Sequence, residues 1–249
     1  MLKLWLKNIR SLHRRLRMSH LARQWVPDAQ SLLVIAPHPD DETIGCGGVI
    51  ALAKVWGMRV SILFLTRGGS SLRLAGVDGS EVAEARSAHA VRAAAALGLQ
   101  PEDLIFWDLM DGGIPQPGED GFAEAAARLV GVIAQGKPDV VFCPHPHDGW
   151  TDHTAAAALV QQALAGQTLE PKLYYYPIWT WHSAPWGMPG FDRKRALRVD
   201  ISSVASRKET ALDIYLHSTP SPAGVPFCGI LPWSLIGLAR WSEEVFFIA

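Results

Sequence analysis

The feature that most constrains the fold is a regular alternation of short apolar runs with longer segments of helical spacing. Apolar runs of strand length occur at 31–36, 59–65, 104–107, 139–143 and 172–176. Segments with helical spacing lie between them, at 43–56, 81–97, 122–135 and 153–165. Strands that alternate with helices are typical of a parallel sheet covered on both faces. The sequence therefore predicts an α/β fold in three layers with a mostly parallel sheet.

The pattern becomes less regular after residue 177. A strand is expected at 195–201, a helix at 203–217 and a last short strand at 245–248. The chain has 249 residues, which suits one large domain with at most a short appendage. We expect residues 1–30 to form a basic amphipathic helical segment and residues 31–249 to form the domain.

Charge is distributed unevenly along the chain. The formal net charge is −1, which argues against general nucleic-acid binding. Residues 1–30, however, hold seven of the 23 basic residues and only one of the 24 acids. This segment lacks the uninterrupted apolar run of a signal peptide or a spanning helix. Residues 1–20 are therefore expected either to pack on the domain or to contact a membrane surface or partner.

The three cysteines lie far apart, at positions 46, 143 and 228. Their spacing matches neither a disulfide framework nor a thiolate zinc site. It suits a reducing compartment, so we expect a cytoplasmic protein. If the N-terminal segment binds lipid, the protein would sit at the inner face of the membrane.

Two of the predicted strands are followed by residues that commonly bind metals. Residues 37–42 read PHPDDE after the first strand, and residues 144–153 read PHPHDGWTDH after the fourth. In a doubly wound sheet these two strands are often neighbours at the point where strand order reverses, and ligands bind there. Five acids and four of the nine histidines are thus expected to converge on one crevice.

A divalent cation accounts for this concentration of charge. Carboxylates packed together repel each other unless a cation neutralises them. Imidazole with carboxylate suits a zinc-type ion, and catalytic zinc keeps three protein ligands and one open position. His38 and Asp41 lie three apart on a tight turn, and His153 follows the other strand. We therefore predict one zinc ion per chain on this triad, with other divalent metals open.

Asp40 lies beside a predicted ligand and is free to accept a proton from metal-bound water. A triad of two histidines and one carboxylate also suits non-haem iron, but the spare carboxylate favours hydrolysis. Residues 45–48 (GCGG) lack the spacing of a dinucleotide-binding loop, so a phosphate cradle there is weakly indicated.

Residues 38–42, the glycines after them and Asp152-His153 resemble the PIG-L/LmbE-like N-acetylglucosaminyl de-N-acetylases. The resemblance covers roughly residues 31–177 and implies a Rossmann-like fold. It implies that His38, Asp41 and His153 bind zinc and that Asp40 is the catalytic base. It also places Arg67 and Asp111 near the substrate.

The chain departs from the family pattern at two places. The family commonly has a histidine three residues before the last zinc ligand, where this chain has Trp150. We expect His147, or else His145, to stabilise the oxyanion instead. Two alternatives stay open: Asp40 and zinc suffice with Trp150 as an apolar or sugar-stacking wall, or the chain is a weak or inactive member. The helix after the second strand usually carries an Arg-x-x-Glu pair, but Arg86 is followed here by His89, and we interpret that pair as structural.

The function expected from these residues is zinc-dependent hydrolysis of an acetamide on an N-acetylated sugar or glycoconjugate. The aromatic residues of segment 174–182 either form a sugar-stacking wall or pack in the core. Two other classes stay open: a metal-free sugar- or nucleotide-binding module, and a degenerate family member that serves in glycoconjugate assembly.

Overall fold

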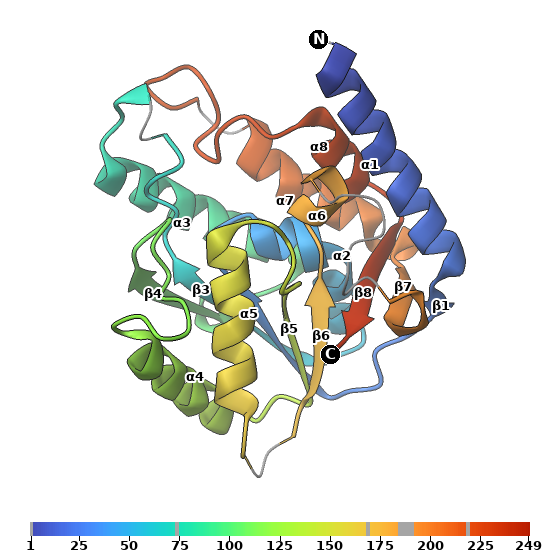
Figure 1. Ribbon diagram of the computed structural model, residues 1–249, viewed down its shortest axis with the longest axis vertical. Coiled ribbons are helices and arrows are strands. Elements are labelled where there is room, and N and C mark those ends of the chain that lie inside the picture. The colour runs from blue at the N-terminus through green and yellow to red at the C-terminus, as the bar shows by residue number, and fades with distance from the viewer. Residues whose placement is uncertain (1, 73–74, 168–169, 184–191, 218–219) are drawn as a thin grey trace.

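One sheet organises the molecule (Figure 1). The computed structural model describes residues 2–72, 75–167, 170–183, 192–217 and 220–249. Within these residues eight strands pair in the order β1-β7-β8-β6-β5-β2-β3-β4. Their bounds are Arg23–Gln24 (β1), Ser31–Ala36 (β2), Arg59–Thr66 (β3), Leu104–Leu109 (β4), Val140–Pro144 (β5), Lys172–Tyr176 (β6), Ala196–Asp200 (β7) and Glu243–Ile248 (β8). Only β8 runs antiparallel to its neighbours, β6 and β7.

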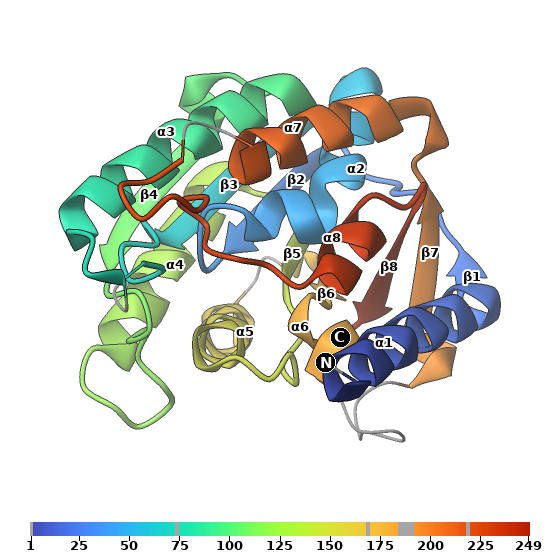
Figure 2. The same cartoon turned by 90° about the horizontal axis from the view of Figure 1, so that it is seen from above.

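Helices cover both faces of this sheet (Figures 1 and 2). Their bounds are Leu2–Leu21 (α1), Asp41–Val55 (α2), Gly79–Leu97 (α3), Phe122–Gly136 (α4), Thr151–Leu164 (α5), Trp179–Ser183 (α6), Ala205–His217 (α7) and Trp233–Ala239 (α8). One apolar core joins the sheet to α2, α3 and α7, and a second joins it to α4 and α5. The predicted three-layer α/β fold with a mostly parallel sheet is confirmed.

The sheet reverses its strand order between β2 and β5. These strands pair in parallel, with Leu32 opposite Val140 and Val34 opposite Phe142. From this point β3 and β4 follow on one side and β6 on the other. Both strands are buried throughout, because helices cover both faces. The expected convergence of the two strand ends is therefore present.

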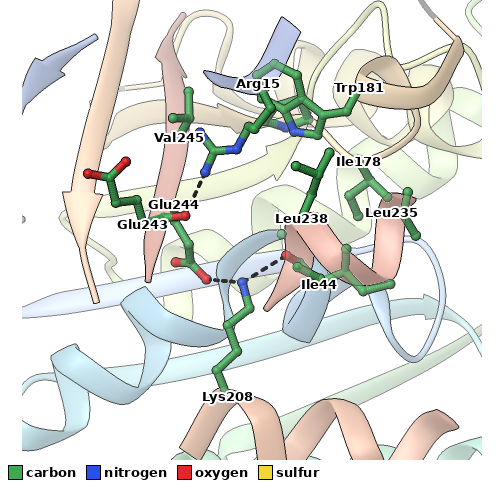
Figure 3. A pocket seen from close by; sticks show the side chains of 13 residues that line it. Arg15, Ile44, Ile178, Trp181, Lys208, Leu235, Leu238, Glu243, Glu244 and Val245 are labelled. Atoms are coloured by element: carbon green, nitrogen blue, oxygen red, sulfur yellow. Dashed lines mark hydrogen bonds and ion pairs between the residues drawn. The ribbon is translucent and has the colours of Figure 1, made fainter. Parts of the chain in front are cut away.

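Close packing fixes α2 beneath this crevice. A Cβ atom at Gly45 would lie 2.4 Å from the Tyr176 ring, and one at Gly48 would lie 2.4 Å from Ile201. Glu244 of β8 accepts hydrogen bonds from the backbone N–H of Gly48 and forms a 2.6 Å ion pair with Lys208 of α7 (Figure 3). Only glycine lets the helix approach this closely.

Three short elements were not expected from the sequence, namely β1, α6 and α8. β1 has two exposed residues and pairs with β7, so it leaves no burial pattern to detect. Through β1, the segment 1–30 contributes an edge strand to the same sheet as the rest of the chain. Among the described residues, no helix has both the length and the hydropathy needed to cross a bilayer.

Candidate active site

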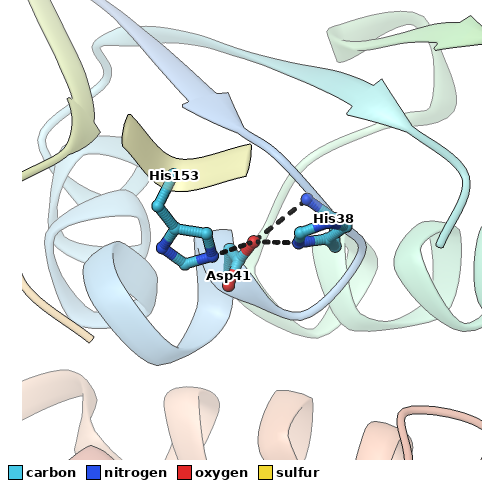
Figure 4. Close-up of side chains that lie close together, drawn as sticks. All are labelled: His38, Asp41 and His153. Atoms are coloured by element: carbon cyan, nitrogen blue, oxygen red, sulfur yellow. Dashed lines mark hydrogen bonds and ion pairs between the residues drawn. The ribbon is translucent and has the colours of Figure 1, made fainter. Parts of the chain in front are cut away.

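The candidate site lies at the carboxyl ends of β2 and β5. The turn after β2 carries His38, Asp40 and Asp41, and α2 begins at Asp41. His153 lies in the first turn of α5. Because the two strand ends are neighbours, side chains that are far apart in sequence meet in one buried cluster (Figure 4).

Three donor atoms of this cluster face one another. Nδ1 of His38 lies 3.1 Å from Oδ2 of Asp41, and Nε2 of His153 lies 3.3 Å from the same oxygen. In tetrahedral zinc sites with bonds of about 2.0–2.1 Å, neighbouring donor atoms are about 3.3–3.4 Å apart. The three residues thus have the chemistry and the spacing that a zinc-sized cation requires.

The second ring nitrogen of His153 is held by Asp148. Nδ1 of His153 lies 2.7 Å from Oδ2 of Asp148, which is fully buried. Asp148 also accepts hydrogen bonds from the backbone N–H groups of Ile178, Trp179 and Thr180 and from the Thr180 hydroxyl. A carboxylate with this many donors is an acceptor, so Nδ1 carries a proton. The arrangement leaves Nε2 of His153 available to a cation.

The second ring nitrogen of His38 is held by two carboxylates. Nε2 of His38 lies 2.9 Å from Oδ2 of Asp152 and 3.1 Å from Oδ1 of Asp111. These three residues also have the spacing of a metal site. However, Oδ2 of Asp152 accepts a 2.7 Å hydrogen bond from the backbone N–H of Gly112. Oδ2 of Asp111 accepts a 2.7 Å hydrogen bond from the backbone N–H of Ser70. Because backbone N–H groups already hold both carboxylates, we interpret the two acids as groups that orient the His38 ring.

The pKa values of all three proposed ligands are shifted by burial and by their charged neighbours. Burial lowers the pKa of His153, but Asp41 and Asp148 outweigh it and raise the pKa to about 9. Burial also opposes the charged form of His38, yet bonds to Asp111, Asp152 and Asp41 raise its pKa well above the usual value. Burial disfavours ionised Asp41, but the two histidines bring its pKa far below the ordinary range. A bound cation would therefore displace protons from the imidazoles.

Asp40 has an unusual backbone and a perturbed side chain. Its φ is 128°, a conformation that L-residues rarely adopt, and such strain is often found at functional positions. Glu42 supports the turn by accepting a 3.0 Å bond from the Asp40 N–H. Burial raises the pKa of Asp40 to about 7, although Arg86, 3.1 Å from the carboxylate, opposes the shift. A carboxylate near this pKa suits general-base chemistry.

A pocket of about 350 Å³ opens above the cluster. Its charged side includes His38, Asp40, Asp41, Arg86, Asp111 and His153. Its apolar side includes Ile44, Trp150, Ile178, Trp179, Ile230 and Leu231. The rings of Trp150 and Trp179 stack with centroids 5.0 Å apart. Trp150 is 45% exposed, so one indole face can meet a ligand at the mouth.

The structure brings together most of the site residues expected from the sequence. Asp111 and Trp150 line the pocket with the triad and Asp40. Arg67 does not line it: its Nε bonds Asp108 and its guanidinium lies over the Phe106 ring. His147 is exposed and likewise lies outside the lining that the described residues form. His145 is buried against Tyr175 and Phe247.

Segment 174–182 packs in the core for the most part, while the sugar-stacking wall stays a prediction for the residues that face the pocket. Its tyrosines belong to β6 and contribute to the two cores, whereas Trp179 faces the pocket. Trp181 packs under the guanidinium of Arg15, away from the site.

Sequence reasoning missed the roles of three residues, namely Arg86, Asp148 and Asp152. Arg86 was interpreted as structural, but it lines the pocket and pairs with Asp40. The signal for Arg86 was a cation on a helix that follows the second strand. Asp148 and Asp152 were visible as acids within the second motif, but sequence spacing does not reveal which imidazole nitrogen each one meets.

Comparisons with known proteins agree with this geometry. The model of the PIG-L family, described as GlcNAc-PI de-N-acetylase, matches residues 33–164. A diacetylchitobiose deacetylase of Thermococcus kodakarensis is 32% identical over 141 residues, which are 55% of this chain and 50% of that protein. The chain thus aligns with only half the length of this curated relative.

Two solved structures share the fold. The N,N'-diacetylchitobiose deacetylase of Pyrococcus horikoshii superposes with a TM-score of 0.60 at 23% identity, over 75% of this chain and 70% of that one. GalB, a 4-carboxy-2-hydroxymuconate hydratase of Pseudomonas putida KT2440, gives a TM-score of 0.60 at 24% identity, over 76% and 80%. Because these structures bear different activities, the fold alone does not assign a reaction.

Proposed function

We propose, from the premise that this chain belongs to the PIG-L family of GlcNAc-PI de-N-acetylases, that it is a metal-dependent hydrolase that removes acetyl groups from N-acetylated sugars or glycoconjugates. The observation that carries the proposal is the donor triad of His38, Asp41 and His153 with Asp40 beside it in one pocket. Metal-dependent hydrolysis of an amide uses such a Lewis-acid site next to a base.

His38, Asp41 and His153 are proposed to hold one zinc ion per chain, with other divalent metals as alternatives. When bound, the ion polarises the acetamide carbonyl and lowers the pKa of a water molecule towards about 7. Asp148 holds one ring proton of His153 on Nδ1, so Nε2 is the nitrogen that gives up its proton and binds the ion, and Asp152 and Asp111 leave Nδ1 of His38 for the ion in the same way.

Asp40 is the proposed general base. Its carboxylate lines the pocket beside the triad, so it can take a proton from the attacking water and later give it to the departing amine. Arg86 holds this carboxylate at 3.1 Å and donates to the backbone oxygen of Pro39 at 2.6 Å. Arg86 therefore positions the base on the turn that carries the ligands. A nearby divalent cation also favours the ionised carboxylate.

The oxyanion of the proposed reaction needs an electrostatic partner. Trp150 stands where the family commonly has a histidine, and an indole offers one N–H donor but no positive charge. His147 was expected to compensate, yet its exposed position gives no support to that role. The role of His147 stays a prediction, and the cation is the principal electrostatic partner of the oxyanion in our proposal.

The substrate is proposed to be a small N-acetyl sugar amine or a glycoconjugate that carries one. The stacked pair of Trp150 and Trp179 offers the flat apolar surface on which a pyranose ring can lie. The name of the Thermococcus relative supports the same class. Asp111, which is bonded to Ser70 and lines the pocket, is proposed to accept a hydrogen bond from a sugar hydroxyl. The substrate role expected for Arg67 stays a prediction.

The decisive experiment measures acetate release from a panel of N-acetyl hexosamines and N-acetyl chito-oligosaccharides with added zinc. We expect turnover of at least one compound and loss of that turnover after chelation. If the same sugars bind without acetate release, the result would instead favour a non-catalytic sugar-binding protein. Because the hydratase GalB shares the fold, hydration of an unsaturated acid should also be assayed, and we expect none.

A further inference from the structure

The N-terminal helix α1 buries several polar side chains and exposes several large apolar ones, which is unusual. Over residues 9–21, where side chains are described, the three most buried positions are polar, although Met18 also packs on the core. Ser11, Arg15 and Ser19 are buried, at 0%, 3% and 5% exposure. The outward positions include large apolar side chains, and these are Ile9, Leu12, Leu16 and Leu21, at 38–52% exposure. An amphipathic helix on a globular domain normally buries its apolar face.

Specific polar contacts explain why the polar face turns inward. Arg15 donates a 2.6 Å hydrogen bond to the backbone oxygen of Glu243 in β8 (Figure 3). Its guanidinium also lies 5.2 Å from the Trp181 ring and 5.5 Å from that of Trp241. Ser19 donates to the Glu243 carboxylate. These contacts fix the rotation of the helix, so the outward apolar residues are held away from the core.

The outward face of α1 carries both large aliphatic side chains and arginines. Ile9, Leu12 and Leu16 follow the spacing of one helical stripe, and Arg10 and Arg17 are exposed beside it. The segment 1–30 holds seven basic residues and one acid, in a chain whose net charge is −1. A stripe of apolar residues flanked by arginines is the arrangement that binds the interface of an anionic bilayer.

We propose that the outward face of α1 docks this protein on an anionic lipid surface, with the helix lying in the plane of the interface. A second copy of the chain is disfavoured as the occupant, because a symmetric contact would bring like-charged arginine stripes together. α8 packs between α1 and the catalytic pocket, since Leu238 and Arg15 line one cavity while Leu235 also lines the pocket. Docking therefore leaves α1 and α8 between the membrane and the pocket.

The test is co-sedimentation of the full chain with vesicles of phosphatidylcholine alone or mixed with phosphatidylglycerol. We expect binding to the anionic vesicles at low salt and release at about 1 M salt, where the Debye length is about 3 Å. Arg10→Gln with Arg17→Gln should weaken partitioning about 30-fold, because each basic residue at such a surface contributes about fivefold. Leu12→Ser with Leu16→Ser should weaken it at least as much.

Matched controls come from exposed residues elsewhere. Val55→Ser changes an apolar side chain that is 55% exposed, and Arg92→Gln removes an exposed cation; neither should change partitioning. Circular dichroism checks that all variants are folded. Equal binding to neutral and anionic vesicles, no binding at low salt, or unchanged binding of the leucine variant would each overturn the proposal. So would a dimer, seen by light scattering, that the leucine variant converts to a monomer. Acetate release from a soluble sugar should be unaffected in every variant, so the outcome is independent of the catalytic proposal.

Discussion

Replacing Asp148 by asparagine is expected to weaken zinc binding although Asp148 is not a proposed ligand. In the parent, Oδ2 of Asp148 accepts from Nδ1 of His153 at 2.7 Å, and Oδ1 accepts from Ile178 and Thr180. Asparagine has one oxygen and one NH₂ group, so it cannot satisfy both sides. If the NH₂ group faces His153, the ring must move its proton to Nε2, the nitrogen that a cation needs.

The magnitude follows from the number of groups that lose a partner. Loss of an orienting carboxylate typically weakens metal affinity about 10–100-fold, or about 1.4–2.7 kcal/mol. If the NH₂ group instead faces Ile178 and Thr180, two backbone donors are left unpaired, at about 1–3 kcal/mol each. The first orientation therefore weakens metal binding, and the second lowers the free energy of unfolding.

Thr180→Val is the matched control. It removes the 2.6 Å bond from the Thr180 hydroxyl to Asp148 but leaves the bond to His153 intact. We expect it to lower the free energy of unfolding by about 1 kcal/mol while zinc affinity stays within about threefold of the parent. Zinc affinity is measured by competition with a chromophoric chelator, and stability by urea unfolding of the metal-free proteins. Parent-like zinc affinity in Asp148→Asn, or an equal loss in both variants, would refute the orienting role.

Four further outcomes are expected. His153→Ala should lose bound metal, and full occupancy measured by plasma mass spectrometry would remove it from the ligand set. Asp40→Asn should retain metal but lose about 10²–10⁴-fold in kcat; near-normal turnover would exclude it as the base. His147→Ala should lose about 10²-fold if this residue supplies the oxyanion donor, whereas a large gain in Trp150→His would show that the histidine missing at that position is limiting. Zinc affinity should rise at least tenfold per pH unit between pH 6 and 8, because the pKa of His153 is about 9 and its imidazolium must lose a proton to bind; a flat profile would contradict this proton competition.

The sequence was sufficient to predict the layered fold and the meeting of the two strand ends. The periodicity of 31–36 and 139–143 marks buried strands, and parallel pairing of β2 with β5 then brings His38 close to His153. Local spacing also identifies Asp40 and Asp41, because they follow His38 on the same turn. These inferences depend on short-range pattern and on one topological rule.

Other features depend on side-chain directions that no spacing encodes. Which imidazole nitrogen faces Asp148 or Asp152 is decided by the rotation of α5 and by the loop before it. Arg86 meets Asp40 only because α3 crosses near the turn after β2. The rotation of α1 is similarly set by Arg15 and Glu243, at opposite ends of the chain, so its apolar stripe suggested burial as readily as exposure.

The position of β8 has a consequence for the order in which the molecule assembles. β8 is the last strand in chain order, yet it lies between β6 and β7, and β1 reaches the rest of the sheet only through β7. Glu243 of β8 also holds Arg15 of α1, across a separation of 228 residues. Part of the docking site of α1 is therefore missing until β8 has been inserted, although α6 and α8 also contact this helix. Contacts this distant in sequence form late and slowly, so α1 stays without its contacts to Glu243 until β8 has been made and inserted.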